Sequence, residues 1–252
     1  ATARAWRRQG LAPGDHVALL SENHPNYLEI YWAALRTGLY IAAINHHLTA
    51  DESSYIIGDC GARALFVSAS VADHVDLAPE ANPGVEHRVV FGGRLDGFED
   101  YRTLLEVQST EAPADQPRGH DFLYSSGTTG RPKGVRVDPP EGQIDEVPDY
   151  YTPIFSFLYG FDANSIYLCP APLYHAAPLR FCGVVNSVGG TVILMDRFDA
   201  EESLRLIEQY SVTHSQWVPT MFVRMLKLPE QTRAAYDVSS LKVAIHAAAP
   251  CP

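Results

Sequence analysis

The architecture of this chain follows from three short apolar segments, His16-Val-Ala-Leu-Leu20, Tyr40-Ile-Ala-Ala-Ile44 and Ala64-Leu-Phe-Val67. Two segments with helical signatures separate them. The first opens at Asn23-His-Pro25 and carries apolar residues at helical spacing. The second opens with Thr49-Ala-Asp-Glu52, which fits a capping box. Short buried strands that alternate with helices are typical of a mainly parallel sheet covered by helices.

The alternation continues along the rest of the chain. Further strands are predicted at Arg88–Phe91, Asp121–Tyr124, Ser165–Leu168, Thr191–Leu194, Thr213–Trp217 and Leu241–His246. Helices are predicted after His175, after Asp199 and from Met221 to Leu226. We therefore expect an α/β fold with two mainly parallel sheets flanked by helices, incomplete at both ends. Residues 1–137 would form a first subdomain, and residues 138–252, which open with an acidic loop up to Asp149, a truncated second one.

The composition is that of a globular protein, with 252 residues, 46% of them hydrophobic. A formal net charge of −11 argues against a general nucleic-acid or anionic-membrane surface and leaves small-molecule chemistry open. The cysteines lack the spacing of a metal or redox motif, as expected for free thiols in a reducing cytosol. They are Cys60, Cys169, Cys182 and Cys251. We expect a cytoplasmic location, with peripheral membrane association left open and the natural start upstream of Ala1.

The segment Tyr124-Ser-Ser-Gly-Thr-Thr-Gly-Arg-Pro-Lys-Gly-Val135 has the ingredients of a phosphate-binding loop. Glycines permit a positive φ and a close approach to a ligand, and a lysine supplies a point charge. Backbone N–H groups in such a turn form a concave anion site. The glycines and the lysine are Gly127, Gly130, Gly134 and Lys133. The hydroxyl groups come from Ser125, Ser126, Thr128 and Thr129.

The spacing excludes a Walker A loop, which needs four residues between its glycines and a Ser or Thr after the lysine. An exposed Gly/Ser/Thr hairpin is the alternative for a bare glycine turn. The complete string, however, resembles the signature loop of the AMP-forming acyl-CoA synthetases and the wider adenylate-forming superfamily. In that superfamily the loop closes over the β- and γ-phosphates of ATP. The resemblance therefore implies ATP binding by residues 125–134.

Three further strings follow in the order of that superfamily. Pro172-Leu-Tyr-His175 resembles the segment bordering the acyl site, which implies substrate contacts for Tyr174 and His175. The segment 212–221 resembles the strand and turn that line the acyl pocket, which implies the same for Trp217 and Met221. The string 246–250 resembles the strand end on which adenine packs. The residues implied there are His246, Ala247, Ala248, Ala249 and Pro250.

The resemblance also implies a reaction. A carboxylic acid would be activated by ATP to an acyl-adenylate and passed to coenzyme A. Segments 170–179 and 246–252 most resemble those of fatty-acyl-CoA synthetases, which implies a fatty acid. Lys133, Thr128 and His175 are the implied catalytic residues, and Thr128 the implied ligand of Mg²⁺. The small C-terminal domain of the superfamily is absent from the chain, so residues 1–252 alone are expected to be inactive. No nucleic-acid partner is expected.

Purely structural roles remain open as alternatives for several of these residues. Trp217 and Met221 fit a hydrophobic core as well as a pocket wall. The alanines after His246 fit a tight contact between a helix and a strand. The pair His46-His47 is interpreted as loop surface, because no ligand partner lies at metal spacing. The acceptor could be another thiol, such as that of a carrier protein, and the fragment could be a non-catalytic nucleotide- or acyl-binding module.

Overall fold

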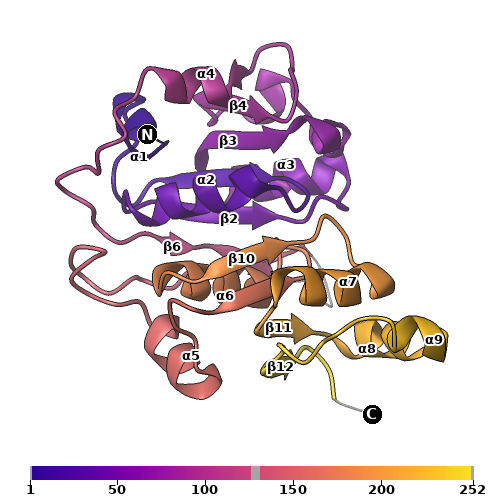
Figure 1. Cartoon of the computed structure of the whole chain (residues 1–252). Helices are drawn as coiled ribbons and strands as arrows, with labels where there is room; N and C mark the ends of the chain where they lie inside the picture. The colour runs from indigo at the N-terminus through magenta and orange to yellow at the C-terminus, as the bar shows by residue number, and fades with distance from the viewer. Residues whose placement is uncertain (1, 126–130, 251–252) are drawn as a thin grey trace. The chain divides into compact units, whose positions relative to one another are not determined.

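The computed structural model describes residues 2–125 and 131–250 and divides into two compact units, Ala1–Asp149 and Tyr150–Pro252. Figure 1 labels the helices and strands. The first unit is built on a six-stranded sheet in the order β5-β4-β3-β1-β2-β6, in which every neighbouring pair is parallel. Its strands are β1 (His16–Leu20), β2 (Tyr40–Ile44), β3 (Ala62–Ser68), β4 (His87–Phe91), β5 (Glu99–Asp100) and β6 (His120–Asp121).

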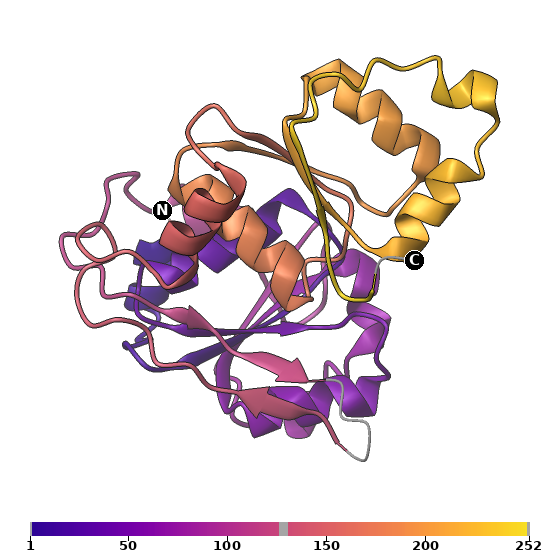
Figure 2. The ribbon, with the colours of Figure 1, turned by 90° about the horizontal axis from the view of Figure 1, so that it is seen from below.

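Side chains of this sheet alternate between two buried faces, and helices lie on both (Figure 2). Ala18 and Leu20 of β1 join the cluster on the face covered by α3 (Ala50–Asp59) and the 3₁₀ segment η1 (Ala69–His74). The other face is covered by mutually contacting helices, with Trp6 against Phe66 at 5.1 Å between ring centroids. These helices are α1 (Thr2–Arg8), α2 (Pro25–Leu35) and α4 (Tyr101–Glu106). A further 3₁₀ segment, η2, spans Pro79–Ala81.

The second unit has a four-stranded sheet in the order β10-β9-β11-β12, and all of its pairs are parallel. Helix α6 contacts β9 and packs with α5, whereas α7 and α8 cover the cluster that contains Leu168 and Trp217. The strands are β9 (Ile166–Cys169), β10 (Thr191–Leu194), β11 (His214–Trp217) and β12 (Val243–His246). The helices are α5 (Tyr151–Tyr159), α6 (Ala176–Ser187), α7 (Ala200–Tyr210), α8 (Pro219–Leu226) and α9 (Glu230–Arg233).

The structure confirms the expected fold class and most of the predicted elements. The capping box at Thr49 is present, and Asp199 caps α7 through the backbone N–H groups of Glu201 and Glu202. The segment predicted as one strand at Asp121–Tyr124 is two: β6 joins the sheet, and β7 (Leu123–Ser125) pairs instead with β8 (Lys133–Val135) in an antiparallel hairpin. Helix α5 was not predicted, because its apolar residues surround it without a clear polar face.

The division between the units falls after Asp149, whereas the sequence placed it after Val137. The intervening loop belongs with the first unit because it is hydrogen-bonded there. The backbone N–H of Ile144 donates to the carbonyl of Gln116 at 2.9 Å, and the Arg118 guanidinium donates to the carbonyl of Ile144 at 2.7 Å.

Gly119 tests how tightly β6 docks onto the sheet. A Cβ there would lie 2.2 Å from the carbonyl oxygen of Leu39 and 2.6 Å from that of Ala34, both backbone atoms. Since overpacking of this kind costs about 1–3 kcal/mol or more, Gly119→Ala should lower the free energy of unfolding by at least that amount. Gly84→Ala is the matched control, because its Cβ meets no atom within 4 Å. Equal stabilities of the two variants in urea denaturation would contradict the close approach.

Candidate functional site

The glycine-rich segment sits on the β7–β8 hairpin. Residues Leu123, Tyr124 and Ser125 face Val135, Gly134 and Lys133 across the pair, and the Ser125 hydroxyl donates to the carbonyl of Lys133 at 3.4 Å. Gly134 has no positive φ, contrary to its expected role as a turn glycine. A Cβ at this position would instead lie 2.4 Å from the ring of Phe122 and 3.3 Å from that of Tyr124. Gly134 is therefore required by aromatic packing beneath the loop.

Helix α3 anchors the hairpin at β7 and at the residues just before β8. The Tyr124 hydroxyl donates to the Asp59 carboxylate at 2.6 Å, and the Tyr55 hydroxyl donates to the carbonyl of Pro132 at 3.5 Å. The Arg131 guanidinium lies over the Tyr55 ring, 4.7 Å from its centroid. Burial, together with the hydrogen bond to Asp59, raises the pKa of Tyr124 well above its usual value, so the hydroxyl remains a donor. Tyr55 and Asp59 lie one helical turn apart, and sequence reasoning did not single them out.

The predicted phosphate ligands fall into two groups. Ser125 and Lys133 are exposed on the two hairpin strands, and the Lys133 ammonium makes no ion pair with any residue from 2 to 125 or from 131 to 250. The remaining predicted residues, which include the proposed Mg²⁺ ligand, lie outside the described residues. They are Ser126, Gly127, Thr128, Thr129 and Gly130.

In the second unit, the predicted acyl and adenine residues lie at one edge of the sheet. Tyr174 and His175 follow β9, and Trp217 and His246 are the last residues of β11 and β12, opposite each other in the parallel register. Carboxyl ends of parallel strands meet at the same edge, where ligands bind in open α/β sheets. The fold therefore brings together three segments separated by tens of residues in sequence.

His175 occupies the N-cap position of α6 without using its side chain as a cap. Its ring lies 4.4 Å from that of Tyr174, centroid to centroid. Desolvation lowers the pKa of His175, and burial raises the pKa of Tyr174. Both side chains are consequently uncharged at neutral pH and present hydrogen-bonding groups beside an aromatic surface.

Trp217 and Met221 are core residues, with 1% and 7% of their surfaces exposed. Trp217 packs with Leu168 and Met195 under α7 and α8, and Met221 joins this cluster from α8 itself. Trp217 also borders an apolar cavity of about 300 Å³ together with Phe222 and Met225, whereas Met221 does not line it. The buried Nε1–H of Trp217 has no hydrogen-bond partner among the described residues.

In the predicted adenine segment, His246 packs within the protein while the last residues of the segment are exposed. The imidazole of His246 stacks on Phe222 at 6.0 Å with 10° between the planes, and its buried Nε2 has no partner in the described chain. Residues 248–250 are exposed, and Ala248 has a φ of +74°. For a residue with a Cβ this left-handed conformation costs about 1–2 kcal/mol. Such strain is concentrated at ligand-binding sites, and no residue pattern around Ala248 predicts it.

A metal centre is not evident in the part of the chain that the structure covers: no group of three or more His, Cys, Asp or Glu side chains there is arranged to hold an ion. None of the described helices is both long and apolar enough to cross a membrane.

Comparison with known proteins accords with this geometry. The profile of the family described as AMP-binding enzyme matches residues 1–252. A feruloyl-CoA synthase from Amycolatopsis sp. is 33% identical over 99% of the chain and 47% of its own length. The fatty acid–[acyl-carrier-protein] ligase ScoC from Streptomyces coeruleorubidus is 29% identical over 98% of the chain and 46% of its length.

Among solved structures, the chain resembles the N-terminal domain of FACL13 from Mycobacterium tuberculosis. The TM-score is 0.80 with 26% identity, over 100% of this chain and 61% of that one. The chain thus spans about half the length of the curated relatives it matches.

Ala248→Gly tests the strain at the end of β12. Glycine adopts a positive φ without steric cost, so the variant should be more stable in urea by about 1 kcal/mol. Ala247→Gly is the control, because Ala247 lacks a positive φ and its backbone N–H donates to the carbonyl of Trp217 at 3.0 Å. Loss of stability in Ala248→Gly equal to that of the control would show that Ala248 is not strained.

Proposed function

The chain belongs to the AMP-binding enzyme family, and from that premise we propose that it is the nucleotide-binding part of an acid–thiol ligase that forms an acyl-adenylate from ATP. The observation that carries the proposal is the β7–β8 hairpin, on which Lys133 is exposed while Gly134 and Tyr124 hold the two strands in place. The strained carboxyl edge of the second sheet supports an adenine and acyl site there.

In the proposed reaction a carboxylate oxygen attacks the α-phosphorus of ATP. The bond to the bridging oxygen of the β-phosphate breaks, and pyrophosphate leaves. A thiol then attacks the acyl carbon, loses its proton, and expels AMP to form a thioester. The first step brings an anion to a polyanion, so catalysis depends on positioning and on charge neutralisation at the departing pyrophosphate.

Lys133 is the cation that we assign to that pyrophosphate, with the Ser125 hydroxyl and the loop hydroxyls as further donors. ATP fits the described residues in one respect: an exposed ammonium without an ion-pair partner stands beside backbone that aromatic packing holds in place. Mg²⁺ would reduce the charge of the triphosphate when bound. Its proposed ligand Thr128 lies outside the described residues, so we derive no step through it.

Tyr174 and His175 are the proposed contacts to the acid, with Trp217 as a buried support behind them. Their uncharged state excludes a simple ion pair with the carboxylate and favours hydrogen bonding beside an apolar body. Residues 247–250 are the proposed adenine contacts, through backbone that is exposed after β12. His246 would act through its stacking on Phe222, which fixes the start of that segment.

Coenzyme A is the proposed acceptor, in line with the name of the feruloyl-CoA synthase. A carrier-protein thiol is the second candidate, because the relative ScoC is named an acyl-carrier-protein ligase. We propose a fatty acid as the substrate, because segment 170–179 resembles that of fatty-acyl-CoA synthetases. The name of the feruloyl-CoA synthase points instead to an aromatic acid. The location is proposed to be cytoplasmic.

If the proposed function is correct, the complete protein should exchange labelled pyrophosphate into ATP only when the acid is present. Octanoate should support faster exchange than ferulate, and Lys133→Ala should slow exchange by about 10²–10³-fold because one preorganised charge is lost at the developing anion. The matched control is Lys227→Ala, which removes an ammonium at the end of α8.

Three outcomes would count against these assignments. Exchange in Lys133→Ala within threefold of the parent would remove the loop from the mechanism. A preference for ferulate would overturn the assignment of the acid while leaving adenylation intact. Thioester formation at normal rates by residues 1–252 alone would contradict the proposal that the catalytic apparatus is shared with the rest of the protein.

The lowered pKa of His175 leads to a prediction about the pH dependence of exchange. Its pKa lies below 6.5, so the neutral imidazole persists as the pH falls through 6.5 and is lost only at lower pH. If the neutral ring binds the acid, kcat/KM for the acid should fall only below pH 6.5. His175→Gln should flatten this limb and raise KM for the acid more than KM for ATP. His47→Gln, at an exposed position of the other unit, is the control. An unchanged acid limb in His175→Gln would exclude the assignment.

A further inference from the structure

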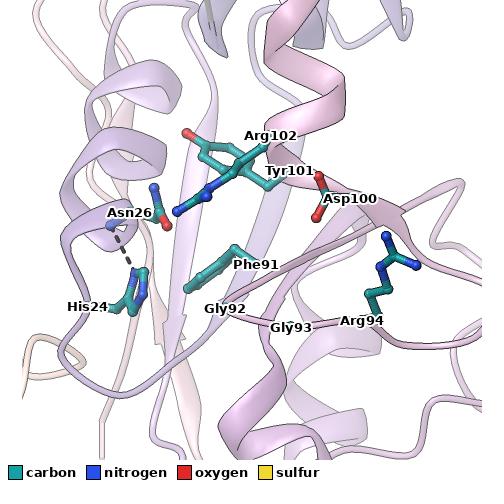
Figure 3. Close-up of a pocket in the computed structure, with 9 residues that line it drawn as sticks. All are labelled: His24, Asn26, Phe91, Gly92, Gly93, Arg94, Asp100, Tyr101 and Arg102. Atoms are coloured by element: carbon teal, nitrogen blue, oxygen red, sulfur yellow. Dashed lines mark hydrogen bonds between the residues drawn. The ribbon is translucent and has the colours of Figure 1, made fainter.

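A cavity lined by polar and aromatic residues lies in the first unit, apart from the glycine-rich segment. Its volume is about 380 Å³, within the range of small-molecule sites. It is formed where β4 ends, at the start of α2 and at the start of α4, as Figure 3 shows. Its lining residues include His24, Phe91, Arg94, Tyr101 and Arg102.

The wall of the cavity is aromatic. Phe91 and Tyr101 are 2% and 1% exposed, and their rings are 6.2 Å apart in an edge-to-face arrangement. The Tyr101 hydroxyl is hydrogen-bonded to Glu29 at 3.2 Å and to Thr2 at 3.1 Å. Tyr101 therefore contributes its ring, and not a free hydroxyl, to the lining of the cavity. The imidazole of His24 lies 5.1 Å from the Phe91 ring.

His24 also supplies a donor. Its Nδ1 accepts from the backbone N–H of Asn26 at 3.2 Å, drawn as the dashed line in Figure 3. An imidazole that accepts at Nδ1 carries its proton on Nε2. The Asn26 amide, part of the same lining, donates to the Glu29 carboxylate at 2.8 Å. The start of α2 thus contributes one donor that is not used within the described residues.

Two guanidinium groups frame the cavity. Arg94 and Arg102 are exposed, and neither guanidinium has an ion pair or hydrogen bond with a residue in the described ranges. Asp100 is the acid in the lining, but its carboxylate caps α4 by accepting from the backbone N–H of Thr103 at 2.9 Å and its hydroxyl at 3.1 Å. These bonds lower the pKa of Asp100, with a smaller effect from Arg94. The Asp100 carboxylate is therefore engaged by the backbone and side chain of α4, whereas the guanidinium groups of Arg94 and Arg102 stay without an ion pair among the described residues.

The turn that carries Arg94 depends on two adjacent glycines. Gly92 has a φ of +73°, and a Cβ on Gly93 would lie 2.6 Å from the Cβ of Ala69. The turn is consequently fixed against η1, and Arg94 leaves it at a defined point. A fixed backbone limits the entropy lost when its side chain engages a ligand.

We propose that this cavity binds a small phosphate ester of a planar group, such as an aryl phosphate or a nucleotide, separately from the loop of residues 125–134. Arg94 and Arg102 hold the phosphate, since guanidinium groups match its oxygens in bidentate geometry. The planar group lies against Phe91 and the ring of His24. On a protein with a net charge of −11, the local pair of arginines selects the site for the anion.

The test uses phenyl phosphate, with phenol and inorganic phosphate as matched probes, in calorimetric titration of the complete protein. Arg94→Gln and Arg102→Gln should each weaken phenyl phosphate binding at least tenfold. Arg8→Gln, an exposed arginine of the same unit, should leave it unchanged. Lys133→Ala should also leave it unchanged, which separates this site from the one proposed for ATP. The His24 ring resonances should shift on titration of the unsubstituted protein.

Three results would overturn the proposal. These are unchanged affinity in both arginine variants, loss of binding in Lys133→Ala alone, and equal affinity for inorganic phosphate and phenyl phosphate. The His24 resonances give a readout that requires no substitution. Since both guanidinium groups are exposed and form no hydrogen bond or ion pair with a described residue, thermal unfolding of the variants should match that of the parent protein.

Discussion

Parallel strand pairing is the constraint from which the rest of this structure follows. Because each crossover returns the chain to the same end of the sheet, the strand-to-helix connections gather at one edge in each unit. In the first unit this edge holds the turn after β4 and the start of α2. In the second it holds Tyr174–His175, Trp217 and His246. The main strands of the first sheet are buried on both faces, so its binding groups are confined to that sheet's edge and to the hairpin.

The β7–β8 hairpin is the exception, because it lies outside the parallel sheets and is attached to helix α3. Its antiparallel strands are held by the hydrogen bond from Tyr124 to Asp59 and by ring packing against Gly134. Hydrogen bonds to charged groups contribute about 1.5–3 kcal/mol. The stem is therefore fixed to α3, while Ser125 and Lys133 remain exposed to solvent. The ATP site that we propose at this hairpin requires a fixed base with accessible donors.

Sequence patterns predicted the two sheets well, because each sheet is built from short apolar strands with helices between them. Contacts distant in sequence were not predictable. Gly134 reads as a turn glycine, yet its role is set by Phe122, and nothing local marks Ala248 for a positive φ. Trp217 fits both a pocket and a core by composition, and only burial shows that it belongs to the core. The cavity beside Arg94 joins residues from three elements, so no single motif encodes it.

Adenylation is the central claim, and an isotope experiment tests it most directly. The complete protein would be incubated with ATP, coenzyme A and a carboxylic acid whose carboxylate oxygens are ¹⁸O. If a carboxylate oxygen attacks the α-phosphorus and the thiol then cleaves the acyl–oxygen bond, mass spectrometry should find that oxygen in AMP. Unlabelled AMP, or ¹⁸O in inorganic phosphate with ADP as the product, would contradict the account.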